Sequence, residues 1–131
     1  MKKILGRHFI LELMGCDFEI LDNYNKINNI LEEFCINLDL AKIGQLHHKF
    51  QPQGVTIVIG ITESHISIHT WPEFGYAALD IFTCNMEKDF ETQIFDLINK
   101  MKCKEYNLKV LSRGINNSKS VKEEEKEDER T

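Results

Sequence analysis

Two stretches of the chain place apolar residues at the three- and four-residue spacing of an amphipathic helix. The apolar positions of the first stretch are Ile27, Ile30, Leu31, Phe34, Cys35 and Leu38. Those of the second stretch are Phe90, Ile94, Leu97, Ile98 and Met101. Asp22 and Asp89 precede them, and an aspartate side chain can cap the first turn of a helix. The sequence therefore predicts two helices, each with one face in the core.

Segments rich in β-branched and large apolar residues account for most of the remaining chain, as is typical of strands. After allowing for a turn at 51–54, we expect strands over 4–14, 41–50, 56–62, 74–82 and 106–111. The order is strand, helix, three strands, helix, strand. It predicts an α+β fold, a two-layer α/β sandwich with an antiparallel sheet and the helices packed on one face. Because the other face or an edge of the sheet then needs a cover, we expect a homodimer.

The alternation of apolar residues changes phase in the middle of the chain. Isoleucine occupies odd positions between 57 and 61, but even positions at 66 and 68. Side chains of a strand point to alternate faces, so a change of phase requires a bulge, a turn or a break. The change falls on Glu63 and Ser64, and the sequence predicts an irregular backbone at this step.

Length and charge limit the classes of protein that fit. The chain has 131 residues, the size of one ordinary domain, and a formal net charge of −5. We predict one domain over 1–115 and a disordered charged tail over 116–131, where the residues are too polar to form a core. Because the basic residues form no dense cluster, we expect no nucleic-acid partner.

The sequence also bears on location. It contains no run of about eighteen apolar residues, so we expect no membrane span. Arg7 and His8 interrupt the region where a secretory signal needs an apolar stretch, which favours a cytoplasmic protein. The four cysteines form no C-x-x-C pair, and in a reducing compartment we expect free thiols.

Candidate chemistry gathers around the irregular step. His65 and His69 are four residues apart, but their β-branched neighbours favour a strand over a metal-binding helix, so we expect no metal site. Ser64 lacks the G-x-S-x-G motif of serine hydrolases, and no spacing rule supports a hydrolase pair of Cys84 and His69. The residues alone indicate an irregular Glu-Ser step beside histidines, and they do not define a reaction.

Longer motifs carry a resemblance to a known family. They are Leu5-Gly6-Arg7-His8, Gly15-Cys16-Asp17, His48-Lys49-Phe50-Gln51-Pro52-Gln53-Gly54-Val55, Glu63-Ser64-His65-Ile66-Ser67-Ile68-His69-Thr70-Trp71-Pro72-Glu73-Phe74-Gly75-Tyr76-Ala77-Ala78, Asp80-Ile81-Phe82-Thr83-Cys84 and Arg113-Gly114. Together they resemble the bacterial and archaeal type of S-adenosylmethionine decarboxylase proenzyme, over about nine-tenths of the chain.

The resemblance implies that the chain cleaves itself between Glu63 and Ser64. The Ser64 hydroxyl would attack the Glu63 carbonyl, and elimination and hydrolysis would leave a covalent pyruvoyl group, the cofactor, at position 64. His69 is similar to the family histidine that transfers protons during processing. Thr56 stands where the family usually has a serine, and it keeps the hydroxyl while adding a methyl group.

The resemblance further implies decarboxylation of S-adenosylmethionine, which supplies the aminopropyl donor for spermidine biosynthesis. The pyruvoyl carbonyl would form a Schiff base with the substrate amine and act as the electron sink. Cys84 is similar to the family's general acid, and a thiol is mostly protonated near neutrality. We expect Phe50 and Trp71 to stack on the adenine and Glu73 to bind the ribose hydroxyls.

Two other functions remain open at this stage. A pyruvoyl enzyme of this size could instead decarboxylate a basic amino acid, such as ornithine or arginine. A non-catalytic homologue that regulates an active partner is a further alternative, although Ser64, His69 and Cys84 are all present. Gln51, Phe74 and Asn85 differ from the residues usual in the family, but none of these differences removes a reacting group.

Overall fold

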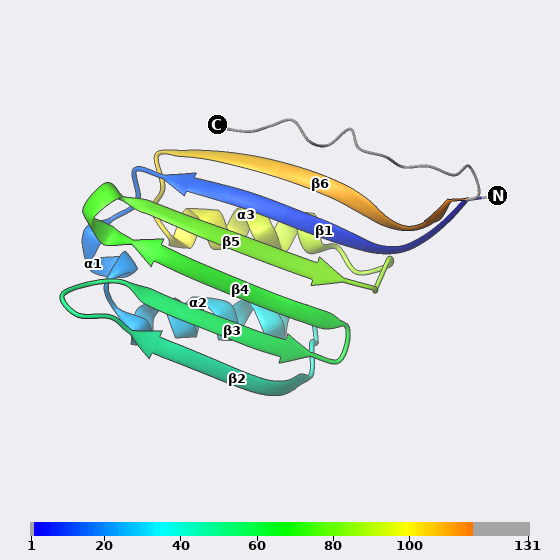
Figure 1. Ribbon diagram of the computed structural model, residues 1–131, viewed down its shortest axis with the longest axis horizontal. Coiled ribbons are helices and arrows are strands. Elements are labelled where there is room, and N and C mark those ends of the chain that lie inside the picture. Colours follow the sequence, from blue (N-terminus) through cyan, green and yellow to red (C-terminus); the bar gives the residue numbers. More distant parts are fainter. Residues whose placement is uncertain (1, 117–131) are drawn as a thin grey trace.

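A computed structural model describes residues 2–116 and forms a single antiparallel sheet with helices behind it (Figure 1). The elements, in chain order, are β1 (Lys2–Met14), α1 (Phe18–Leu21), α2 (Tyr24–Asn37), β2 (Lys42–Lys49), β3 (Val55–Ile61), β4 (Ser64–Trp71), the 3-10 helix η1 (Pro72–Phe74), β5 (Tyr76–Thr83), α3 (Phe90–Lys100) and β6 (Glu105–Asn116). The predicted tail over 116–131 lies outside the described residues, apart from Asn116 at the end of β6.

The sheet has six strands in the order β2-β3-β4-β5-β1-β6. Every neighbouring pair of strands is antiparallel. α2 and α3 both lie against one face of the sheet (Figure 1). The predicted α+β fold, with an antiparallel sheet and helices on one face, is therefore confirmed.

The core lies between this sheet face and the two long helices. β3 alternates buried and half-buried residues along its whole length, as a strand covered on one face does. The predicted helical stripes supply the other side of the core, with Ile27, Leu31 and Phe34 from α2 and Phe90 and Ile94 from α3 all buried. Both predicted helices are thus confirmed with the predicted faces inward.

The phase change at Glu63 and Ser64 is a hairpin. β3 ends at Ile61, β4 begins at Ser64, and the two strands pair with Ile61 opposite Ser64. The chain reverses direction through a two-residue turn, so the isoleucines of both strands face the helices despite their different phase. The sheet consequently has one strand more than the five predicted.

Other boundaries also differ from the predictions. Asn23, not Asp22, caps α2, and its side chain accepts a hydrogen bond from the Lys26 N–H at 3.0 Å. Asp22 is free for a tertiary contact described below. β6 extends well beyond 106–111 because it pairs with β1 along almost its entire length, a contact that local patterning does not reveal.

The second face of the sheet carries mixed polar and apolar side chains. Alternation places His65, His69 and Trp71 of β4 and Asp80 and Phe82 of β5 on this face. No helix among residues 2–116 covers it (Figure 1). The four cysteines are free in the structure. Within the described part of the chain, no helix is long and apolar enough to span a membrane.

Candidate active site

The turn between β3 and β4 contains the candidate cleavage site. Ser64, the first residue of β4, has a φ of +144°, which side-chain-bearing residues rarely adopt. The preceding turn is anchored by a hydrogen bond from the Thr62 N–H to the Ala41 carbonyl at 2.9 Å. Strained backbone of this kind persists only where the surrounding structure enforces it, and it concentrates at functional sites. The irregular backbone predicted at the Glu63–Ser64 step is confirmed.

The carbonyl of Glu63 accepts a hydrogen bond from the backbone N–H of Cys84 at 2.9 Å. Ser64 pairs with Thr83, the last residue of β5, so Cys84 lies next to the Glu63–Ser64 bond. A fixed N–H aimed at a carbonyl oxygen polarises the carbonyl and stabilises negative charge that develops on it. Cys84 is exposed and Ser64 is half-buried, so a small molecule can reach both side chains.

The Glu63 side chain is held by the loop that follows β5. One carboxylate oxygen accepts from the Lys88 ammonium at 2.8 Å and from the Asn85 amide at 3.4 Å. The other oxygen is buried without a hydrogen-bond partner. Sequence reasoning missed Lys88 and Asn85 as site residues, because no motif spacing connects this loop to a turn more than twenty residues earlier.

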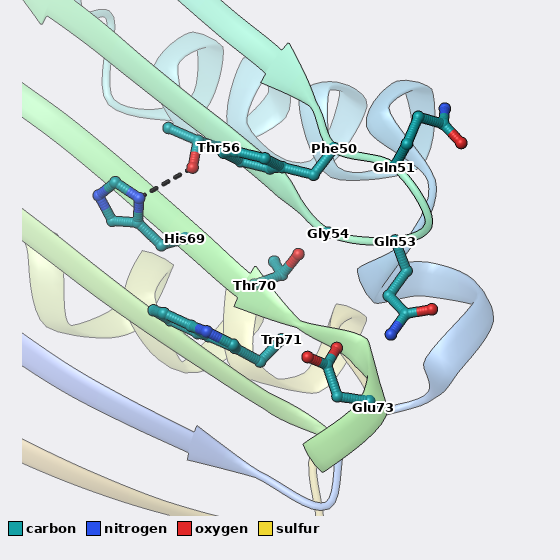
Figure 2. A pocket seen from close by; sticks show the side chains of 9 residues that line it. All are labelled: Phe50, Gln51, Gln53, Gly54, Thr56, His69, Thr70, Trp71 and Glu73. Carbon is teal, nitrogen blue, oxygen red and sulfur yellow. Dashed lines mark hydrogen bonds between the residues drawn. The ribbon is translucent and has the colours of Figure 1, made fainter.

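A pocket of about 350 Å³ lies at the opposite end of β4 (Figure 2). The Thr56 hydroxyl and Nδ1 of His69 form a hydrogen bond at 2.9 Å within it. The two residues face each other across β3 and β4. The residues that line the pocket are Phe50, Gln51, Gln53, Gly54, Thr56, His69, Thr70, Trp71 and Glu73. The pocket therefore contains all the predicted substrate-binding residues. It also contains Thr56 and His69, the two predicted processing residues that lie outside the turn.

Two aromatic side chains flank the Thr56–His69 pair (Figure 2). Phe50 is 44% exposed and Trp71 is 40% exposed, although both are large enough to contribute to a core. Trp71 also packs against Tyr76, with ring centroids 5.4 Å apart. Burial, together with a hydrogen bond to the Glu12 carboxylate, raises the pKa of Tyr76 to about 12. Exposed aromatic faces beside a polar pair suit a flat ligand with polar groups.

Hydrogen bonds and an ion pair with neighbouring segments stabilise the walls of the pocket. Asp22 accepts from the Gly54 N–H at 2.9 Å and pairs with Lys49, and these contacts hold the pKa of Asp22 below its usual value. The buried Thr70 hydroxyl accepts from the Val55 N–H and donates to the Leu21 carbonyl, both at 2.8 Å. The turn before β3 and the end of β4 are thereby fastened to the start of the helical layer.

The predicted site residues thus fall into two clusters at opposite ends of β4. The cleavage-end cluster consists of Glu63, Ser64 and Cys84. The pocket-end cluster consists of Phe50, Thr56, His69, Trp71 and Glu73. His69 lies five residues after Ser64 along the extended strand, which corresponds to about 16 Å. One chain alone does not bring the predicted nucleophile and the predicted proton-transfer histidine together. Among residues 2–116, no group of three or more His, Cys, Asp or Glu side chains is arranged to hold a metal ion.

Known proteins resemble this chain along nearly its whole length. Residues 7–114 match the S-adenosylmethionine decarboxylase family. The S-adenosylmethionine decarboxylase proenzyme of Sulfurihydrogenibium sp. is 42% identical over 116 residues, covering 88% of this chain and 86% of the relative. That of Pyrococcus furiosus is 40% identical over 123 residues, covering 89% and 84%.

A solved structure agrees with these sequence matches. The crystal structure of the adenosylmethionine decarboxylase from Aquifex aeolicus superposes with a TM-score of 0.80 at 35% identity, covering 92% of this chain and 99% of that one. The fold is therefore that of a class of decarboxylase enzymes. The chain is a member of the S-adenosylmethionine decarboxylase family. The family resemblance and the enzyme class predicted from the sequence are confirmed.

Proposed function

We propose that the chain is a proenzyme that cleaves itself between Glu63 and Ser64 and then decarboxylates S-adenosylmethionine through a pyruvoyl group derived from Ser64. One observation carries the proposal in a chain of this family. Ser64 has a strained backbone, and the carbonyl just before it, that of Glu63, accepts a hydrogen bond from the Cys84 N–H at 2.9 Å. The names of the relatives support both the proenzyme and the substrate.

Cleavage begins when the Ser64 hydroxyl oxygen attacks the carbonyl carbon of Glu63. The carbon–nitrogen bond breaks, the hydroxyl proton passes to the freed amine, and an ester joins the two residues. The Cys84 N–H stabilises the negative oxygen during the attack. Elimination then removes a proton from the Ser64 α-carbon and releases Glu63 as a carboxylate that ends the fragment 1–63. Hydrolysis releases ammonia and leaves the carbonyl at position 64.

The residues around position 64 fit the group that this cleavage forms. A pyruvoyl group supplies an electron sink for loss of carbon dioxide from an amine substrate. The exposed Cys84 thiol stands beside it and would deliver the proton that the α-carbon needs after decarboxylation. At the pocket end, Phe50 and Trp71 would hold the adenine, and Glu73 would accept from the ribose hydroxyls.

Assembly of a complete site requires a second copy of the chain. The cleavage and pocket ends are about 16 Å apart on β4, and the open sheet face between them has no helical cover among the described residues. In the proposed homodimer, two such faces pack against each other around a two-fold axis that lies between them, perpendicular to the strands. This axis makes the strands of the partner run in the opposite direction. The pocket end of one protomer then lies over the cleavage end of the other, giving two complete sites in each homodimer.

In this arrangement His69 and Thr56 act on the Ser64 of the partner protomer. The hydrogen bond between them fixes the orientation of the imidazole, which leaves Nε2 free to exchange protons with the reacting groups. The Thr56 hydroxyl retains the function of the usual serine because its Oγ1 reaches His69 at 2.9 Å. The extra methyl group does not prevent this contact.

The intact mass of the purified protein under denaturing conditions tests the proposal. We expect two fragments, residues 1–63 and a carbonyl-capped fragment from position 64, in place of the full chain. Ser64→Ala removes the attacking hydroxyl, so that variant remains one chain without decarboxylase activity. A wild-type chain that stays uncut under all conditions would refute the proposal and favour the regulatory homologue.

Substrate choice is tested separately from cleavage. Carbon dioxide release from carboxyl-labelled S-adenosylmethionine, ornithine and arginine distinguishes the proposed substrate from a basic amino acid. The aromatic pocket favours the adenosyl substrate, because ornithine and arginine have no flat ring to stack. A cytoplasmic location stays a prediction from the sequence.

A further inference from the structure

The loop between β5 and α3 binds Glu63 at two separate points. Cys84, at its start, donates its backbone N–H to the Glu63 carbonyl at 2.9 Å. Lys88, further along, places its ammonium 2.8 Å from Oε2 of the Glu63 carboxylate. The same ammonium donates to the Asp39 carbonyl at 3.0 Å. One loop thereby fixes both the backbone and the side chain of the residue before the cleaved bond.

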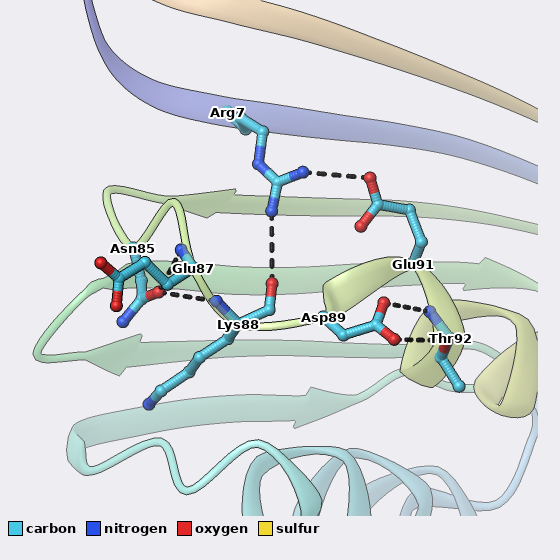
Figure 3. Close-up of polar contacts among 7 residues, drawn as sticks. All are labelled: Arg7, Asn85, Glu87, Lys88, Asp89, Glu91 and Thr92. Atoms are coloured by element: carbon cyan, nitrogen blue, oxygen red, sulfur yellow. Dashed lines mark hydrogen bonds and ion pairs between the residues drawn. The ribbon is translucent and has the colours of Figure 1, made fainter.

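This loop is well suited to hold Lys88 in one place (Figure 3). The Asn85 side-chain oxygen accepts from the backbone N–H groups of Glu87 and Lys88, both at 2.9 Å. The Arg7 guanidinium donates to the Lys88 carbonyl at 3.4 Å and pairs with Glu91 of α3 at 3.0 Å. The lysine backbone is thus fastened to β1, to its own loop and to the following helix.

The contact matters energetically because both side chains are largely shielded from water. The side chain of Lys88 is 26% exposed and that of Glu63 is 20% exposed. The second Glu63 oxygen is buried and has no hydrogen-bond partner. Without the Lys88 ammonium, the Glu63 carboxylate would be a largely buried charge with no cation beside it. It would gain solvation by turning outward to water. Such a turn would rotate the attached backbone away from the Cys84 N–H.

We propose that Lys88 is a positioning residue for self-cleavage. It holds the Glu63 side chain so that the Glu63 carbonyl stays on the Cys84 N–H and within reach of the Ser64 hydroxyl. Lys88 touches none of the reacting atoms, and it acts only through Glu63. The inference rests on the proposed self-cleavage and adds a residue to it. After cleavage, the same ion pair would retain the new carboxyl end of the fragment 1–63 beside the loop.

The rate of cleavage of newly made chain tests this role. Wild type, Lys88→Met and Lys88→Arg are synthesised in a cell-free system, and conversion to fragments is followed by denaturing mass spectrometry. We expect Lys88→Met to slow conversion about tenfold, and Lys88→Arg to restore most of the rate because it keeps the charge. Lys100→Met is the matched control, since Lys100 also pairs with two carboxylates, Glu33 and Asp96, but does not contact Glu63.

Two further measurements separate positioning from folding and locate the affected step. In an uncut Ser64→Ala background, Lys88→Met should lower the melting temperature no more than Lys100→Met does. Hydroxylamine cleaves the ester directly. If Lys88→Met forms too little ester, hydroxylamine-treated Lys88→Met should still be cleaved more slowly than hydroxylamine-treated wild type. A Glu63→Gln/Lys88→Met double variant should be no slower than the slower single variant, because both changes remove one contact.

The outcomes distinguish this inference from the proposed function. Cleavage of Lys88→Met at the wild-type rate would overturn the positioning role while leaving the proenzyme intact. Equal slowing in Lys88→Arg and Lys88→Met, accompanied by a large loss of melting temperature, would also overturn it. So would cleavage of Lys88→Met by hydroxylamine at the wild-type rate, since the ester would then form normally. An uncut wild-type chain would instead refute self-cleavage itself.

Discussion

The two ends of β4 differ in how their side chains are held. At the cleavage end, a two-residue turn, a strained Ser64 and a tightly bonded loop hold the Glu63 carbonyl in one position. At the pocket end, Phe50 and Trp71 are more than one-third exposed around a hollow of about 350 Å³. The proposed cleavage requires a bond that is held in one position, whereas the proposed substrate needs an open surface to enter and leave. The comparison indicates a division of tasks within one strand.

The largest expected effect tests whether the two ends cooperate between chains. Ser64→Ala has no nucleophile and His69→Ala no proton-transfer group, so neither variant should cleave efficiently alone. When both are co-expressed, mixed dimers contain one site built from intact halves, about a quarter of all sites with random pairing. Denaturing mass spectrometry should then show cleavage of the His69→Ala chain only. Absence of that cleavage in isolated mixed dimers would contradict the two-chain site.

The second prediction separates the two proposed functions of Cys84 at the cleavage end. Cys84→Ala removes the thiol but keeps the backbone N–H that contacts the Glu63 carbonyl. We expect turnover per pyruvoyl group to fall about a hundredfold, the usual contribution of a general acid. The rate of self-cleavage should change by much less. Labelled carbon dioxide release and mass spectrometry measure the two rates, and full turnover would exclude Cys84 as the acid.

The third prediction concerns substrate binding at the pocket end. Trp71→Ala should raise the KM for S-adenosylmethionine about tenfold, because a stacked base loses its aromatic partner. Trp71→Phe keeps a smaller ring and should lie between wild type and alanine. Cleavage at Ser64 should be affected less than binding. An unchanged KM in the alanine variant would remove Trp71 from the substrate site.

The smallest expected effect concerns Thr56. Thr56→Val keeps the shape of the side chain but loses the hydrogen bond to His69, and we expect self-cleavage to slow about tenfold or less. Thr56→Ser keeps the hydroxyl and serves as the control, with a rate close to that of wild type. A time course of fragment formation measures both. Equal rates for valine and serine would show that the hydroxyl has no part in processing.

Local patterns predicted the helices and the irregular step well, since spacing and alternation respond to which face a residue buries. They were less successful where pairing decided the outcome. The strand that ends at Asn116 is longer than expected because β1 supplies hydrogen-bond partners over that length. The phase change could mean a bulge, a turn or a break, and only strand pairing identified it as a hairpin.

The sequence by itself determined the helical stripes, the irregular Glu-Ser step and, through its motifs, the family. The tertiary structure alone decided that the candidate site residues divide between the two ends of one strand, and that Lys88 reaches Glu63. The physical reason is that local sequence fixes which face a residue prefers. Distances between segments depend on register and on loops that the chain forms only when it folds.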